Sequence, residues 1–148
     1  MTHEAYIEGL LPAAQINDGR DIPIHACIVK SGETLSKAHN QKEGLQDPTA
    51  HAEVLVIREA AQKMGSWRLP DTTLYVLVEP CWMCTGAIYA ARIPRVVFGV
   101  CNPKGGGLLH AQKHRRALGL NHSVEVDYGY HEDKIQTLLS HFFASKRG

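Results

Sequence analysis

Two short groups of potential metal ligands, lying in separate parts of the chain, constrain its fold most strongly. His51-Ala52-Glu53 opens one helical pattern, and Pro80-Cys81-Trp82-Met83-Cys84 opens the next, and each group follows a proline-bearing turn. Thiolate and imidazole groups are the usual ligands of Zn²⁺, and a catalytic zinc site leaves one of four coordination positions open. We therefore expect a fold that brings His51, Cys81 and Cys84 together as three zinc ligands between two helix starts.

Glu53 is expected to act on water rather than on the metal. It lies two residues beyond His51, a spacing that makes it awkward for both side chains to bind one ion. Zinc lowers the pKa of a bound water to about 7. A carboxylate beside that water can accept its proton and pass it on to a leaving group. The pattern therefore predicts Glu53 as the catalytic proton shuttle.

Each motif alone is weak evidence for such a site. A Cys-x-x-Cys pair can be a redox pair, but that interpretation leaves His51 and Glu53 unexplained. A structural zinc site would need a fourth protein ligand. Cys27 and Cys101 lie in or beside apolar β-type runs, so we expect them to be small core residues rather than ligands. The two motifs together favour a catalytic metal site.

The hydrophobic pattern predicts an α/β fold with a mixed sheet and helices on both faces. A helical pattern over 4–17 contains Pro12, where we expect a kink or a restart. The other expected elements are strands near 24–29, 34–38, 72–78, 95–100 and 124–127, and helices near 50–64, 81–92 and 131–145, with a further possible helix before the last strand.

Length and composition bound the remaining possibilities. The 148 residues are expected to form a single domain, residues 1–148, because 44% hydrophobic residues supply a full core for one domain of this size. No apolar run approaches the ~18 residues of a membrane span, and Met1-Thr2-His3-Glu4 lacks the features of a signal peptide. We therefore expect a cytoplasmic protein with no membrane partner. The net charge of +1 is far from that of an obvious nucleic-acid-binding domain, so any such contact needs a local patch.

With these motifs in place, the chain resembles the bacterial tRNA adenosine deaminases of the TadA type, within the cytidine-deaminase-like superfamily. The zinc motifs mark the superfamily, as the H-x-E…P-C-x-x-C signature of zinc nucleobase deaminases. Arg92–Gly99, Asn121-His122 and Phe142-Phe143 point to the tRNA branch. The resemblance covers nearly the whole chain, including Asp21-Ile-Pro-Ile, His39-Asn40, Asp47–Glu53, Leu74–Cys84, Gly86-Ala-Ile, Asn121–Glu125 and Leu138–Phe143.

The resemblance implies a cytidine-deaminase-like three-layer α/β/α sandwich with a five-stranded mixed sheet. It also implies a zinc-dependent homodimer that converts adenosine to inosine at the wobble position of a tRNA anticodon stem-loop. His51, Cys81 and Cys84 match the zinc ligands, and Glu53 matches the shuttle that moves a proton to the ring nitrogen and the leaving amine. Asn40 matches a side chain that hydrogen-bonds the target base, and the Ala52 backbone N–H matches a donor into the same pocket.

The chain departs from the family pattern in two places. His25 stands where the family has a small residue, so the first strand is expected to pack differently. In the loop over 101–110, which touches anticodon nucleotides in the family, Lys104 is kept but the usual acid is Asn102. A neutral side chain there predicts weaker discrimination between RNA and DNA. We expect Asn102, Lys104, Asn121 and Phe143 to contribute to substrate binding.

Two alternatives remain open at this point. A free nucleobase or nucleoside deaminase, acting on guanine, cytosine or a related ring, would use the same zinc centre with a small substrate. A zinc-bearing interaction protein would have no turnover, which Glu53 and the open zinc position argue against. The role of the basic run Lys113–Arg116 is also open. It can be a solvated face, or it can form part of a groove that binds RNA phosphates together with Phe142-Phe143 and Lys104.

Overall fold

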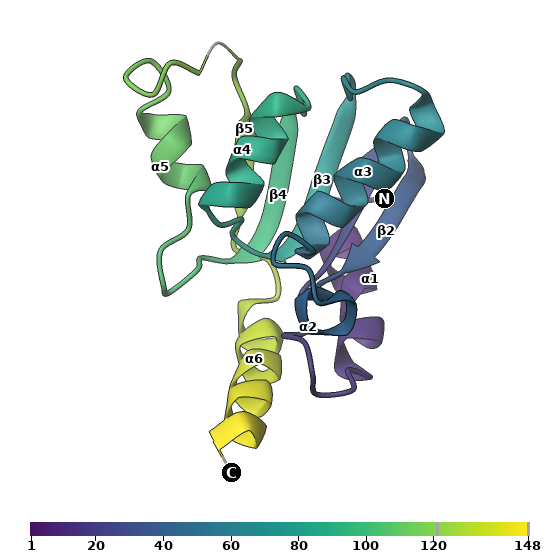
Figure 1. Ribbon diagram of the computed structural model, residues 1–148, viewed down its shortest axis with the longest axis vertical. Coiled ribbons are helices and arrows are strands. Elements are labelled where there is room, and N and C mark those ends of the chain that lie inside the picture. The colour runs from purple at the N-terminus through teal and green to yellow at the C-terminus, as the bar shows by residue number, and fades with distance from the viewer. Residues whose placement is uncertain (121, 148) are drawn as a thin grey trace.

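The computed structural model describes residues 1–120 and 122–147, which form six helices and one five-stranded sheet (Figure 1). The helices are α1 (His3–Gln15), α2 (Lys42–Leu45), α3 (Ala52–Met64), α4 (Trp82–Ala90), α5 (Leu108–Lys113) and α6 (Glu132–Arg147). The strands are β1 (His25–Lys30), β2 (Glu33–His39), β3 (Thr72–Val78), β4 (Arg95–Val100) and β5 (Glu125–Tyr128).

The sheet is mixed and has the order β2-β1-β3-β4-β5. β1 pairs antiparallel with β2 and with β3, whereas β3 with β4, and β4 with β5, run parallel. The parallel pairs need helical crossovers between their strands. α4 supplies the first crossover, so the carboxyl end of β3 leads directly into the start of α4 (Figure 1).

Two separate hydrophobic clusters cover the two faces of the sheet, because successive strand residues point to opposite faces. On one face α3, α4 and α5 pack through residues such as Val56, Ile88 and Leu108. On the other face α1 and α6 pack through Ile7, Leu11 and Ile135, among others. Helices on both sides of one sheet confirm the predicted three-layer α/β/α sandwich with a five-stranded mixed sheet.

Three local expectations need correction. α1 continues through Pro12, which is exposed in its last turns, because Leu10, Leu11 and Ala14 hold the helix against the sheet. Cys101 is exposed, since β4 ends at Val100 and the chain turns into a surface loop. The short helix α2 was missing from the sequence-based expectation. It forms after β2, where the two carboxylate oxygens of Asp21 accept the backbone N–H groups of Glu43 and Gly44 at 2.7 and 3.0 Å.

The other expectations for the core and the first strand have clearer outcomes. Cys27 is 3% exposed and belongs to the core, as expected. His25 is accommodated in β1 by pairing with His39 of β2, and their rings stack with centroids 5.2 Å apart. No helix in the described ranges is long and apolar enough to cross a membrane.

Candidate active site

The starts of α3 and α4 lie side by side on one face of the sheet and position the candidate metal ligands. His51 is the N-cap residue of α3 and Cys81 is the N-cap residue of α4, while Cys84 lies in the first turn of α4. The end of β2 is tied to the same place, because the Gln41 N–H donates to the Ala50 carbonyl at 2.9 Å. A helix N-terminus favours negative charge, so it stabilises thiolates there.

The structure brings together the three residues that the sequence proposed as ligands. His51 Nδ1 lies 3.6 Å from the Cys81 sulfur and 3.5 Å from the Cys84 sulfur, and all three ligand atoms are within 4.8 Å of one another. A tetrahedron with Zn–S bonds of about 2.3 Å and Zn–N bonds of about 2.0–2.1 Å has an N···S edge of about 3.5 Å. The donor set and its spacing therefore fit one zinc ion with a fourth position open.

The two thiols differ in how readily they ionise. Hydrogen bonds from Cys84 and then from His51 stabilise the Cys81 thiolate and lower the pKa of Cys81 to about 3. The Cys84 thiol is buried and donates to that thiolate, which raises the pKa of Cys84. The hydrogen bond with Cys81 also raises the pKa of His51. Cys81 is therefore held as a thiolate, which is the form of cysteine that binds zinc.

Glu53 is buried beside this cluster. Its side chain is on the second residue of α3, and the residue is only 5% exposed. Burial raises the pKa of Glu53 to about 7, an effect that the charge of Cys81 adds to and that His51 opposes. A carboxyl group that titrates near neutral pH can both accept and return a proton. This is the property that the proposed proton shuttle requires.

Asn40 and Ala52 are linked to the cluster through the chain, because Asn40 precedes Gln41, which is bonded to Ala50, and Ala52 follows His51. Asn40 is the first residue after β2 and is 7% exposed, and its side-chain oxygen accepts the Lys42 N–H at 3.1 Å. Ala52 is fully buried as the first residue of α3. The first N–H groups of a helix have no acceptor within the helix, so that of Ala52 is available by position to a ligand.

A groove of about 670 Å³ extends from Asn40 to the C-terminal helix. Its lining includes Arg20, Lys42, Phe142, Phe143 and Lys146. The structure therefore places Asn40 and Phe143, which are far apart in the sequence, on the same groove. The described part of the C-terminal helix supplies both aromatic rings, packed edge to face with centroids 5.4 Å apart.

The loop after β4 meets this helix. Lys104 Nζ lies 5.5 Å from the centre of the Phe143 ring. The side-chain oxygen of Asn102 accepts the Lys104 backbone N–H at 3.0 Å, so Asn102 shapes the turn that presents Lys104. Asn121, also expected to bind substrate, lies outside the described residues.

Sequence reasoning missed Glu79, which holds the same loop. This carboxylate is 6% exposed and accepts the Leu109 N–H at 3.1 Å and the Asn102 N–H at 3.4 Å. A Cβ atom on Gly106 would lie 2.2 Å from the Glu79 carboxyl carbon, so any larger residue there would displace this carboxylate. An acidic residue directly after a buried strand was the available signal, since a buried carboxylate needs donors nearby.

Comparisons with known proteins agree with this geometry. Residues 1–100 match the family model described as the cytidine and deoxycytidylate deaminase zinc-binding region. A tRNA-specific adenosine deaminase of Bacillus subtilis is 41% identical over 143 residues, which are 95% of this chain and 87% of the relative.

Two solved structures extend the comparison. One comes from a study of A-to-I editing by tRNA:A34 deaminases at the wobble position. It superposes with a TM-score of 0.83 at 36% identity over 91% of this chain and 99% of that chain. A guanine deaminase from Bacillus subtilis has a TM-score of 0.65 at 34% identity over 81% of this chain and 71% of that chain.

Proposed function

This chain belongs to the cytidine and deoxycytidylate deaminase zinc-binding family, and we propose that it hydrolytically deaminates adenosine to inosine at the wobble position of tRNA. The choice of tRNA as the substrate is supported by the 41% identity to a tRNA-specific adenosine deaminase along 95% of the chain. The observation that supports the chemistry is the His51, Cys81 and Cys84 group, with Glu53 buried beside it.

We propose that these three residues hold one zinc ion. When bound, zinc supplies the Lewis acidity that makes water a nucleophile near neutral pH. Glu53 would take a proton from the attacking water and deliver it to the ring nitrogen, and would then carry the second water proton to the exocyclic amine, which leaves as ammonia. The sum of the reaction is adenosine and water giving inosine and ammonia. The near-neutral pKa of Glu53 supports this role, because the same group must be both base and acid.

The remaining groups are proposed to orient the substrate. The Asn40 amide and the Ala52 N–H would hold the target base, because an amide pairs donor and acceptor with a purine edge. Phe143 would stack against a neighbouring base, and Lys104 would contact a phosphate. Asn102 would act on the RNA mainly by presenting Lys104, and Asn121 is proposed as a further contact by resemblance.

The assembly and the cellular location are proposed on the same basis. Membership of this branch favours a homodimer, which light scattering coupled to size exclusion would measure. A tRNA substrate favours the cytoplasm, which fractionation of cells would test.

The likeness to a guanine deaminase supports a second candidate, a free-base deaminase. The two candidates differ in the size and charge of the substrate. RNA binding weakens steeply as salt rises, whereas binding of a neutral base is nearly indifferent to salt.

The deciding experiment incubates the zinc-loaded protein with an anticodon stem-loop that carries adenosine at the wobble position. Inosine formation is measured by mass spectrometry, and a stem-loop with guanosine at that position is the matched control. We expect inosine from the first RNA only, with no ammonia from free adenine, guanine or cytosine. Ammonia from guanine without inosine in RNA would overturn the proposal in favour of the free-base deaminase.

A further inference from the structure

The net charge of +1 hides a strong asymmetry along the chain. Residues 80–124 contain no Asp or Glu but six Lys and Arg residues, so the rest of the chain carries ten basic and fifteen acidic residues. The acid-free segment comprises α4, β4, α5 and the loop that follows. It begins at the metal cluster, because Cys81 and Cys84 belong to it. The most basic part of the molecule therefore starts at the candidate active site.

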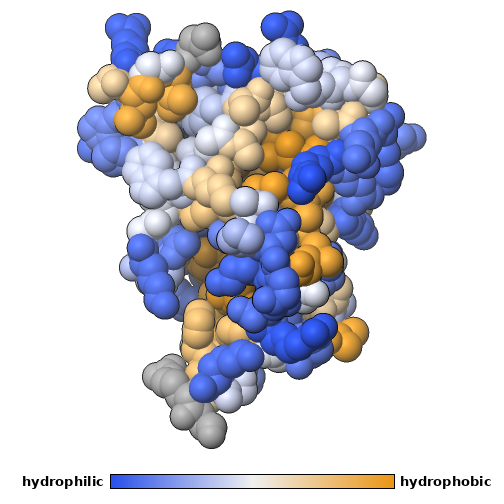
Figure 2. Space-filling model, viewed as in Figure 1, coloured by the Kyte–Doolittle hydropathy of each residue, from blue (hydrophilic) through white to orange (hydrophobic). Residues whose placement is uncertain are grey.

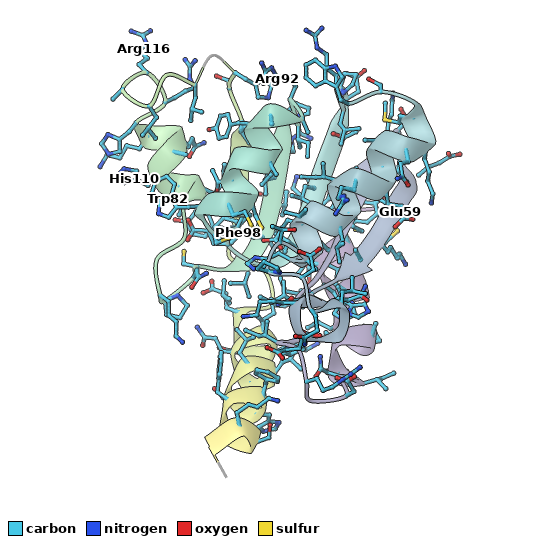
Figure 3. The ribbon with its side chains drawn as sticks, in the orientation of Figure 1. Glu59, Trp82, Arg92, Phe98, His110 and Arg116 are labelled. Atoms are coloured by element: carbon cyan, nitrogen blue, oxygen red, sulfur yellow. The ribbon has the colours of Figure 1, made fainter. Side chains whose placement is uncertain are left out.

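A row of aromatic rings leads away from the cluster within this segment. Trp82 directly follows Cys81 and is 53% exposed. Its ring packs edge-on against that of His110 at a centroid distance of 5.3 Å. The centroid of the His110 ring lies 4.4 Å from that of His114, the residue that caps the C-terminal end of α5. Both histidines are exposed. Figure 3 shows Trp82 and His110 beside each other at α4 and α5, with Arg116 further from α6.

Exposed cations stand at the far end of this row. Lys113 and Arg116 are exposed, and a hollow of about 380 Å³ is lined by Gln112 to Ala117. Arg115 is half-buried and donates to the Leu120 carbonyl at 3.5 Å, so it stabilises the loop and is not counted among the exposed cations. Figure 2 shows hydrophilic residues beside a smaller hydrophobic group over the region where Figure 1 places α5 and the following loop, and Leu118 of that loop is exposed.

We propose that Trp82, His110 and His114, with Lys113 and Arg116, form a second RNA-binding track that carries the substrate strand away from the metal site along α5. The proposal rests on the proposed function, because it assigns a path to the same substrate. Bases stack on exposed rings while cations follow the phosphates, which is the general mode of single-strand binding. The groove at Asn40 and Phe143 is lined by residues of α6, whereas the track lies on α4 and α5, so the track would contact a different part of the RNA from the groove.

A metal ion held by the two histidines is a weaker interpretation. The described residues give His110 and His114 no third ligand, since the one group of three or more ligand atoms found there is the His51 cluster. A protein partner would bury the exposed apolar residues Trp82, Met83 and Leu118, and a change in oligomeric state in the test below is the result that would reveal it.

The test measures RNA binding in a Glu53→Gln background, so that no turnover occurs. The affinity of a labelled anticodon stem-loop is followed over a range of salt concentrations. The charge variant is Lys113→Gln/Arg116→Gln. Its matched control is Lys37→Gln/Arg58→Gln, which removes the same charge from exposed residues of β2 and α3. We expect the salt slope to fall by about 0.7 for each lost phosphate contact in the first pair and to stay unchanged in the control.

A second variant tests the rings. His110→Ala/His114→Ala should weaken binding about tenfold at every salt concentration, because stacking does not depend on released counterions. The proposal would be overturned if the salt slope fell equally in the track pair and in the control pair. It would also be overturned if the track variants bound RNA as tightly as the parent, or if a change in oligomeric state accounted for their lower RNA affinity. Intact RNA binding without inosine formation by the wild-type chain would overturn the proposed function and leave the track standing.

Discussion

The ammonium group of Lys104 lies 5.5 Å from the centre of the Phe143 ring and joins the loop after β4 to the C-terminal helix. Phe143 is 37% exposed and lines the groove that begins at Asn40. One wall of this groove therefore consists of two segments that are remote from each other in the sequence.

Replacing Phe143 should separate RNA binding from the metal chemistry. We expect Phe143→Ala to raise KM for a stem-loop about tenfold, since a stacked base loses about 1–3 kcal/mol without its ring. The zinc content and the melting temperature should stay close to those of the parent, because the ring is outside the core. Trp67→Ala is the matched control, as Trp67 is 60% exposed in the loop after α3. An unchanged KM would show that the ring only shields the helix.

Glu53→Gln should keep the fold and the metal but lose turnover. The amide cannot accept and return a proton, so we expect kcat to fall by about 10²–10⁴ or more. Glu59→Gln is the control on the same helix, because Glu59 is partly exposed and pairs with Lys63 at 3.1 Å. Metal analysis and inosine assays on both variants check this. A near-normal rate at full zinc content would rule out Glu53 as the shuttle.

Cys84→Ala should abolish tight zinc binding. We expect about one zinc per chain in the parent and much less in the variant, because two ligands and water hold zinc far more weakly than three. Cys101→Ala is the control, since Cys101 is exposed in the loop after β4. Full zinc occupancy in Cys84→Ala would contradict the ligand set.

His25 should make the fold less stable in acid. Burial, and then the charge of His39, lowers the pKa of His25 from 6.5 to about 4. Between these values the unfolded chain binds a proton at His25 that the folded chain does not, so stability falls as pH drops from about 6.5 to 4. Above pH 6.5 the effect is absent.

Urea unfolding of the wild-type chain and of His25→Gln at several pH values isolates this contribution. The wild-type chain should lose more free energy of unfolding than the variant over that pH range. Parallel pH dependences would show that His25 binds protons equally well in both states.

The metal cluster was predictable because its information is local. His51 stands at the start of α3, and the first turn of α4 sets the spacing of Cys81 and Cys84. Asn40 and Phe143 carry no such local signal, and only the resemblance to a family linked them to one site. Their meeting on one groove depends on where α6 returns after β5, which no spacing in the sequence specifies.

The errors have equally local causes. Pro12 was expected to disturb α1, but the apolar residues on both sides of it hold the helix to the sheet. Cys101 was counted with the preceding apolar strand, although the strand ends one residue earlier. For Asn102, the sequence shows only that a neutral residue stands where the family has an acidic one. The structure adds that the side-chain oxygen of Asn102 already accepts the Lys104 N–H within a turn.

Glu79 gives a prediction that depends on the loop alone. Its buried carboxylate accepts one backbone N–H from the loop, that of Asn102, and one from the first turn of α5, that of Leu109, and Gly106 leaves the space that the carboxylate fills. In Gly106→Ala the new methyl group would displace the carboxylate and break these bonds. Leaving a fully buried donor unsatisfied costs about 1–3 kcal/mol. Because Asn102 and Leu109 are only half-buried, we expect the two lost bonds together to cost about that much stability and to raise KM for RNA.

A double-mutant cycle separates this contact from general effects of either residue. In a Glu79→Ala background the side chain that Gly106→Ala would strike is gone, so the second substitution should cost much less than it does alone. Residues in direct contact show interaction free energies of about 0.5–3 kcal/mol, whereas the stability changes of substitutions at independent sites simply sum. Urea unfolding of the two single variants and the double variant gives this value. Additive costs would mean that Gly106 is required for the backbone of the loop and not for the Glu79 carboxylate.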